Sequence, residues 1–239
     1  MFYPYSAGLA IAIITAAFSG VSGAHANPAV TMAMIIVRQI SPLRAILYMC
    51  AQCGGGIAGA ALVNGVYNSS GGIKDPILLE NPEKGAFGME FTLTFMVVYV
   101  ICASKADAAT NAAGKPIPPA PANYGSSYGS TAYYNSTQVP PMIGVTSNKP
   151  NPIIVGVAYA GCLISWLGSL NPARALGSAF VSTLDYRFKQ HWIFWVGPFL
   201  GAIAGAFAFE YIFNPFRRRG GFSPFTSTTN PRYFENDVF

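Results

Sequence analysis

The sequence predicts an all-α membrane protein, built as an inverted repeat of membrane-spanning helices with two re-entrant half-helices. Of the 239 residues, 52% are hydrophobic and 10% are charged, which is too little charge to solvate a soluble protein of this size. The tripeptide Asn-Pro-Ala occurs at residues 27–29 and again at 171–173. Each copy opens an apolar segment, 28–37 or 172–181, that is about half the ~20 residues a spanning helix needs.

Both copies of the tripeptide have the composition of a helix start. Asn is a favoured N-cap, and Pro is favoured at the first helical position. A helix N-terminus carries unpaired N–H groups and a partial positive charge, which hydrocarbon cannot solvate. An ordinary N-cap in a soluble turn is the alternative, but the duplication inside apolar sequence argues against it. We therefore expect a water-filled pore at Asn27, Pro28, Ala29, Asn171, Pro172 and Ala173.

Longer apolar segments flank the half-helices and are predicted to cross the membrane. They cover residues 5–21, 45–67, 86–103, 152–168 and 191–213. Small residues one helical turn apart let a neighbouring helix approach closely. Such stripes occur at Gly55 and Gly59 in the second segment, and at Gly197, Gly201 and Gly205 in the last.

These segments divide the chain into successive parts. Residues 104–150 are rich in Pro, Gly, Ser, Asn and Tyr and have no helical or strand period, which predicts a disordered cytoplasmic loop. Arg217 to Arg219 fit a cytoplasmic tail under the positive-inside rule. The parts are a first half (1–67), an extracellular loop (68–85), one span of the second half (86–103), the cytoplasmic loop (104–150), the rest of the second half (151–214) and the tail (215–239).

The two halves differ by one span. The second half contains span, span, half-helix and span, whereas the first contains span, half-helix and span. An inverted repeat that brings two half-helices head to head needs an odd number of full spans in each half. We therefore expect that the first transmembrane helix is missing in front of Met1, in a truncated or wrongly started sequence. A functional five-span protein is the alternative.

Longer sequence motifs around the tripeptides resemble those of a known family. Ser22-Gly23-Ala24-His25 precedes the first copy, Arg174 follows the second, and His191-Trp192-Ile193-Phe194-Trp195-Val196-Gly197-Pro198 lies downstream. With these words the chain resembles the aquaporins, of the major intrinsic protein family, from about residue 5 to residue 215. Residues 38–42 and 51–62 look most like the neurogenic big brain subgroup of arthropods.

The resemblance implies roles for individual pore residues. Asn27 and Asn171 would orient the central water, and the half-helix N-termini behind them would repel cations. Arg174 would form the positive side of a narrow selectivity filter. Ordinary water channels carry Phe, His and often Cys at the other filter positions, so we expect a wider filter here. Counted back from each Asn, these positions are Ala7, Tyr159 and Gly168.

Two further residues are expected to support the pore. Glu90 is a carboxylate inside a predicted span, where charge is costly and usually functional. The family uses a Glu here to accept hydrogen bonds from the backbone of a re-entrant loop, so support is favoured over transport chemistry. His25 is expected to line the cytoplasmic vestibule, with a purely structural histidine as the alternative. No metal or cofactor site is expected.

The expected function is a passive transmembrane channel for water, with other small neutral solutes as further permeants. The resemblance also implies a homotetramer in the plasma membrane. Nucleic acid is not an expected partner, because the basic residues are scattered apart from Arg217 to Arg219. An enzyme is not expected, because the chain has two histidines and no phosphate-binding glycine loop or nucleophile motif.

The alternative is a big-brain-like monovalent cation channel, or an adhesion or signalling membrane protein in which permeation is secondary. The wider filter and the Tyr- and Pro-rich loop at 104–150 favour this alternative. The two intact Asn-Pro-Ala words and the pair Phe194-Trp195 favour the water channel.

Overall fold

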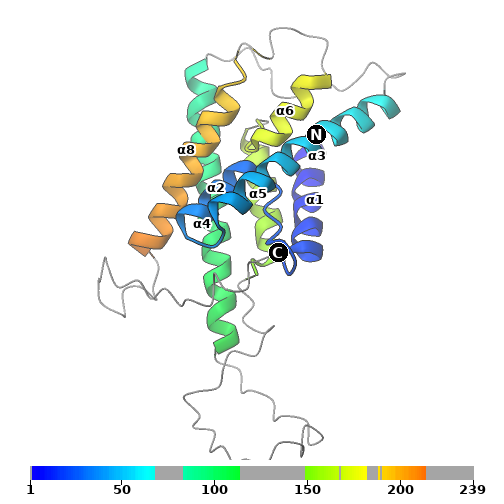
Figure 1. The fold of residues 1–239 in the computed structure, drawn as a ribbon. Helices are drawn as coiled ribbons and strands as arrows, with labels where there is room; N and C mark the ends of the chain where they lie inside the picture. The colour runs from blue at the N-terminus through cyan, green and yellow to red at the C-terminus, as the bar shows by residue number, and fades with distance from the viewer. Residues whose placement is uncertain are drawn as a thin grey trace, which may run out of the picture.

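The computed structural model describes residues 2–67, 83–113, 149–166, 168–181, 188 and 190–213 (Figure 1). Within these ranges all regular structure is helical, as the sequence predicts. The helices are α1 (Tyr3–Phe18), α2 (Pro28–Ile36), α3 (Pro42–Tyr67), α4 (Glu83–Ala113), α5 (Pro152–Ser165), α6 (Pro172–Val181), α8 (Ile193–Phe207) and the π-helical η2 (Ala208–Phe213).

Among the described residues, three helical segments are long and apolar enough to cross a membrane. They are Pro42–Val66, Gly85–Ala106 and Ile193–Phe213, and the apolar helices Tyr3–Phe18 and Pro152–Ser165 are shorter. The half-helices α2 and α6 have almost the bounds that the sequence predicts. This combination confirms the predicted class of an all-α membrane protein.

The boundary of α4 differs from the sequence-based expectation. The span was expected to end at Ala103, but the helix continues to Ala113. Its extension is polar but contains no Pro or Gly, so nothing in the backbone stops the helix there. The rest of the predicted loop, 114–148, lies outside the described residues, as do most of the predicted extracellular loop and the tail.

The helices pack in pairs, most of which join the two halves of the chain. Half-helix α2 packs against α8, and half-helix α6 packs against α3. Helix α1 lies beside α5, and α4 lies beside α8 (Figure 1). Each half-helix therefore rests on a long helix of the opposite half, which is the cross-packing expected of an inverted repeat.

Glycines set the closest approach of α1 to α5. A Cβ atom on Gly8 would lie 2.5 Å from the Gly156 carbonyl oxygen, and a Cβ on Gly156 would lie 2.7 Å from the Gly8 carbonyl oxygen. The two backbones are thus in contact at this crossing, and any larger residue would force them apart.

The two glycine stripes predicted from sequence behave differently. In α8, a Cβ on Gly201 or Gly205 would collide with the backbone of α4, which confirms the predicted close-packing stripe. In α3, Gly55 and Gly59 have open space around them among the described residues. The residue of α3 that does make a close contact is Gly56, which meets the backbone of Ala173 on α6.

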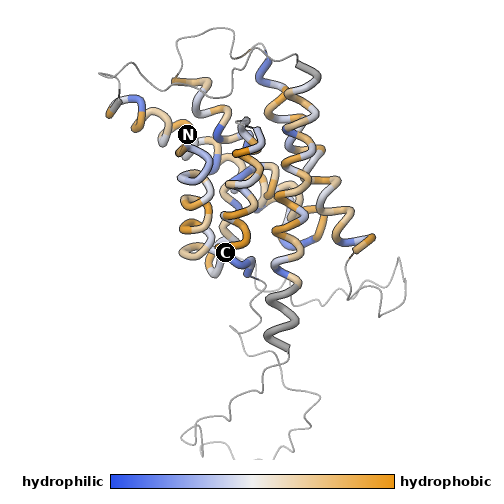
Figure 2. The backbone as a smooth tube through the Cα atoms, turned by 180° about the vertical axis from the view of Figure 1, so that it is seen from behind, coloured by the Kyte–Doolittle hydropathy of each residue, from blue (hydrophilic) through white to orange (hydrophobic). Residues whose placement is uncertain are grey.

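The outer surface is apolar, unlike that of a soluble protein, and polar residues are buried among a mainly apolar core. Large apolar side chains such as Leu9, Leu47 and Leu62 are exposed on the outer helix faces, and apolar residues dominate the helices (Figure 2). The buried polar and charged residues are Thr15, Asn27, Thr31, Glu90, Thr94, Ser104, Lys105 and Ser169. Lipid around the protein explains the exposed apolar side chains, because exposed apolar surface of this extent is unfavourable in water.

Candidate pore

The two Asn-Pro-Ala tripeptides cap half-helices, as the sequence predicts. Asn27 has an extended backbone, and its Oδ1 accepts a hydrogen bond of 2.8 Å from the Ala29 N–H. At the second copy, Asn171 Oδ1 accepts a 3.0 Å bond from the Ala173 N–H. In both copies the Pro opens the helix, where its missing N–H costs no hydrogen bond.

The two caps are joined by reciprocal hydrogen bonds. Asn27 Nδ2 donates to the Leu170 carbonyl oxygen at 2.8 Å, and Asn171 Nδ2 donates to the Ala26 carbonyl oxygen at 2.9 Å. Each amide thus binds the residue that precedes the other asparagine. The N-termini of α2 and α6 therefore meet head to head.

Strained backbone before each cap makes this exchange possible. Ala26 has φ of 50° and Leu170 has φ of 54°, a left-handed conformation that side chains with a Cβ rarely adopt. Because each residue supplies the carbonyl that the opposite amide binds, the strain is part of the junction. Sequence reasoning did not anticipate it, because neither residue is Gly or Asn.

The Tyr159 hydroxyl lies at this junction. It is 3.0 Å from Asn27 Nδ2, and the side chain is 4% exposed. Both amide hydrogens of Asn27 therefore have protein acceptors, Tyr159 and Leu170. Counting back from Asn171 assigns Tyr159 to the filter around Arg174, whereas its hydrogen bond connects it to the centre.

Arg174 is held by a carbonyl and by an aromatic ring. Its Nη1 donates to the Gly168 carbonyl oxygen at 2.5 Å, and its Cζ lies 4.7 Å from the centroid of the Tyr3 ring. Tyr3 lies one helical turn before Ala7 on α1, and residues four apart share a helix face. Ala7 itself is half-buried beside the apolar core.

Tyr3 is a site residue that sequence reasoning missed. The sequence signal that could have found it is an aromatic residue four positions before Ala7. Tyr3 places an aromatic ring against Arg174 even though Ala7 carries only a methyl group.

Gly168 is small because of its packing. A Cβ at this position would collide with the Glu90 carboxylate and the Trp166 indole. A side chain here would therefore point toward Glu90. The missing side chain of Gly168 therefore leaves space on the Glu90 side, which does not support the expectation that Gly168 widens the filter. Gly168 contacts Arg174 through its carbonyl oxygen.

Glu90 organises the turn before the second cap. This fully buried carboxylate accepts hydrogen bonds from the Ser169 N–H at 2.7 Å, the Leu170 N–H at 2.8 Å and Trp166 Nε1 at 3.3 Å. These are the backbone contacts that the resemblance implies. Because Leu170 carries the carbonyl bound by Asn27, Glu90 also fixes the junction indirectly.

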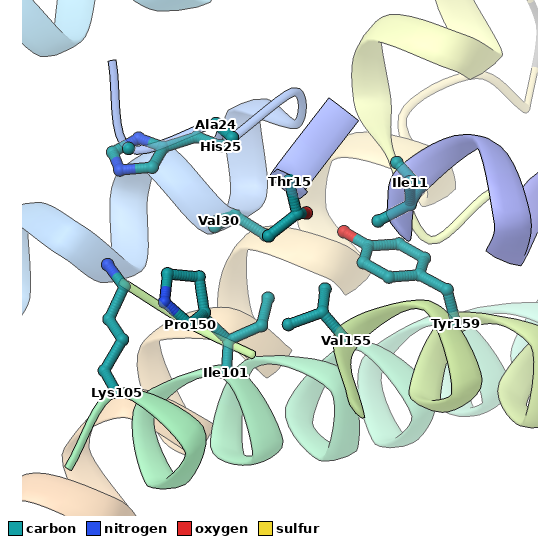
Figure 3. Close-up of a pocket in the computed structure, with 11 residues that line it drawn as sticks. Ile11, Thr15, Ala24, His25, Val30, Ile101, Lys105, Pro150, Val155 and Tyr159 are labelled. Atoms are coloured by element: carbon teal, nitrogen blue, oxygen red, sulfur yellow. The ribbon is translucent and has the colours of Figure 1, made fainter. Parts of the chain in front are cut away.

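His25 lies beside the first cap. Its Nδ1 is 3.2 Å from Thr31 Oγ1, which also accepts a 2.9 Å bond from Gln52 Nε2. With Tyr159 and Lys105 it lines a small cavity whose other walls come mainly from apolar residues of α1, α2, α4 and α5 (Figure 3). Lys105 lay beyond the predicted end of its span and was not among the expected site residues.

Comparisons with known proteins show the family of the chain. The family model described as Major intrinsic protein matches residues 4–129 and 130–209. The neurogenic protein big brain of Drosophila melanogaster is 39% identical over 215 residues, covering 87% of this chain and 25% of that protein. Aquaporin-5 of Homo sapiens is 36% identical over 212 residues, covering 87% of this chain and 67% of that protein. The chain thus spans about a quarter of the Drosophila relative and two thirds of the human one.

A solved structure has the same fold. The X-ray structure of the aquaglyceroporin from Plasmodium falciparum matches with a TM-score of 0.65 at 20% identity, covering 90% of this chain and 84% of that one. At this identity the likeness concerns the fold alone. Taken with the family model and the human relative, it leads to one assignment. This integral, multi-pass membrane protein belongs to the major intrinsic protein family.

Proposed function

We propose that the chain is a passive membrane channel for water and other small neutral solutes. The observation that carries the proposal is the reciprocal bond between the caps, from Asn27 to Leu170 and from Asn171 to Ala26. This exchange aims two helix N-termini at one point inside the protein. We place the centre of the pore there.

The proposed pore excludes cations by fixed positive charge. Each helix N-terminus contributes about half a positive charge, so a cation at the junction is repelled from two sides. Arg174 adds a full charge beside Tyr3. Water and neutral solutes experience no such repulsion, and the polar groups of the wall replace part of their hydration.

Tyr159 is proposed as the narrowest contact on the inner side. Its hydroxyl accepts the amide hydrogen of Asn27 that does not bind Leu170. A permeating water must therefore displace this hydroxyl or bind to it in place of the amide. The filter would then consist of Arg174, Gly168 and Tyr3 with Ala7 behind, and Tyr159 would belong to the centre.

The second candidate is a big-brain-like monovalent cation channel, or an adhesion or signalling protein. The 39% identity with the Drosophila neurogenic protein favours it. Two measurements separate the candidates. A water channel raises water permeability without ionic current, a cation channel carries current, and an adhesion or signalling protein raises neither. We further propose that the protein forms a homotetramer in the plasma membrane.

Swelling of oocytes that express the chain, with currents recorded in parallel, tests this proposal. We expect swelling above that of uninjected oocytes and no added current. Asn171→Asp keeps the shape of the side chain but replaces the amide that donates to Ala26 with a carboxylate. We expect at least about a tenfold loss of water permeability at equal surface expression, because a negative charge there disturbs the junction. Unchanged water permeability in this variant would contradict the pore assignment.

A further inference from the structure

Lys105 brings a positive charge to the wall of the inner cavity. The side chain is 6% exposed and lines the cavity together with His25 and Tyr159 (Figure 3). Tyr159 is bonded to Asn27, so this cavity adjoins the junction of the half-helices. Arg174 contacts Tyr3 and Gly168 instead. The two cations thus belong to different parts of the pathway.

Neutral groups hold the ammonium of Lys105. Its Nζ donates to Gln39 Oε1 at 2.7 Å and lies 3.2 Å from Met34 Sδ. Gln39 is itself fixed, because its backbone N–H donates to the Met34 carbonyl oxygen at 2.8 Å. Among the described residues neither partner carries a negative charge, so these contacts position the ammonium without neutralising it.

Burial makes this charge effective over distance. Charges in an interior of low dielectric constant interact more strongly than the same charges in water, and salt screens them less. The cavity walls contributed by Ile11, Val30, Ile101 and Val155 are apolar. A monovalent cation that enters the cavity from the inner side is therefore repelled, whereas water and neutral solutes are not.

We infer that Lys105 forms a second cation barrier at the inner end of the pore, separate from Arg174. The inference rests on the proposed function and extends it. It implies that cation rejection survives partial loss of the filter. It also bears on the choice between the two candidate functions, because a cation-conducting pore would have to pass this ammonium.

Two backgrounds test the inference, the original chain and the chain carrying Arg174→Gln. In each, Lys105→Gln removes the charge and Lys105→Arg keeps it. The control is Lys149→Gln, because Lys149 is exposed near Gly20 and does not line the cavity. Water permeability and monovalent cation current are measured at matched surface expression.

We expect Lys105→Gln to raise the cation current by about tenfold in the Arg174→Gln background, with water permeability unchanged within about twofold. Lys105→Arg and Lys149→Gln should leave the current at its parental level. Lys105→Met, whose uncharged side chain is only one atom shorter than that of lysine, replaces Lys105→Gln if the latter does not reach the surface.

Equal currents with and without the Lys105 charge in both backgrounds would overturn the inference. An equal rise with Lys149→Gln would also overturn it, because it would indicate a general surface potential. Failure of the proposed function is a different result, in which the unmodified chain raises no water permeability at all.

Discussion

Single polar groups decide what happens at the centre of this protein. The amide of Asn27 donates both of its hydrogens to protein acceptors, the Tyr159 hydroxyl and the Leu170 carbonyl oxygen. For Asn171, the described donor contact is with the Ala26 carbonyl oxygen. The two caps are thus similar as helix starts, but they differ in their amide contacts, because a tyrosine hydroxyl binds the amide of Asn27.

Removing that hydroxyl tests its effect on permeation. Tyr159→Phe leaves the ring in place and frees one hydrogen of Asn27, so we expect water permeability to rise. The lost hydrogen bond should cost about 1 kcal/mol of stability. Stopped-flow measurements on proteoliposomes check the permeability. Tyr99→Phe is the control, because Tyr99 packs among aromatic rings of α4 and η2. A fall in permeability would instead assign Tyr159 the role of binding the passing water.

Glu90 offers a second test at this scale. Glu90→Gln retains one acceptor oxygen but turns an NH2 group toward a backbone N–H of Ser169 or Leu170. Because a buried donor then lacks an acceptor, we expect a loss of about 2 kcal/mol in stability. We also expect lower permeability, since Leu170 no longer holds its position. Thermal unfolding of the purified variant in detergent checks the first effect, and an unchanged midpoint would contradict it.

Helix packing brings these groups together at the scale of elements. The short helices α2 and α6 rest on α8 and α3 of the opposite halves. The crossing of α1 and α5 at Gly8 and Gly156 holds two helices that carry site residues, Tyr3 and Tyr159. Glycine is required at this crossing because backbone touches backbone.

A glycine at a crossing and a glycine on an open face should respond differently to substitution. Gly8→Val inserts atoms where the Gly156 carbonyl oxygen lies, so we expect a loss of about 2–3 kcal/mol from overpacking. Gly59→Val is the matched control, because Gly59 has open space among the described residues. Yield and thermal midpoint in detergent measure both. A comparable loss in Gly59→Val would indicate that this face is covered in the assembled protein.

At the scale of the whole molecule, a few buried polar groups lie within an apolar core, and the outer surfaces are apolar as well. The extension of α4 meets the start of α5, where Ser104 Oγ accepts a 2.6 Å hydrogen bond from the Asn151 N–H. The connection from 104 to 150 therefore begins and ends at one place. Its two ends must lie on the same side of the membrane, at the inner end of the pore proposed above.

This arrangement predicts the topology of the chain. An epitope inserted between residues 68 and 82 should be reached by antibody in intact cells. That connection precedes α4, and the inner connection follows α4, so the two lie on opposite sides of the membrane. An epitope inserted between residues 114 and 148 should be reached only after permeabilisation. The two epitopes are expected on opposite sides because α4 crosses the membrane once, through its apolar segment Gly85–Ala106. Labelling of both epitopes from the same side would contradict that crossing.

The sequence by itself determined the local features of this protein. Helix capping acts within about four residues, so the starts of α2 and α6 were readable at Asn27 and Asn171. The apolar segments specified the membrane helices because burial in lipid depends on composition and length. Family resemblance, together with the position of Glu90 inside a span, predicted that Glu90 supports a re-entrant loop. In the structure its carboxylate accepts hydrogen bonds from the backbone of Ser169 and Leu170.

Tertiary structure decided which side chains meet at the proposed pore. Counting from a motif gives a position along a helix, but an α-helix turns once in about 3.6 residues, so a small change in rotation exchanges the residue that faces inward. The close crossing at Gly8 and Gly156 sets the rotation of α1 and α5. For this reason Tyr3 contacts Arg174 and Tyr159 reaches Asn27, pairings that no spacing along the chain encodes.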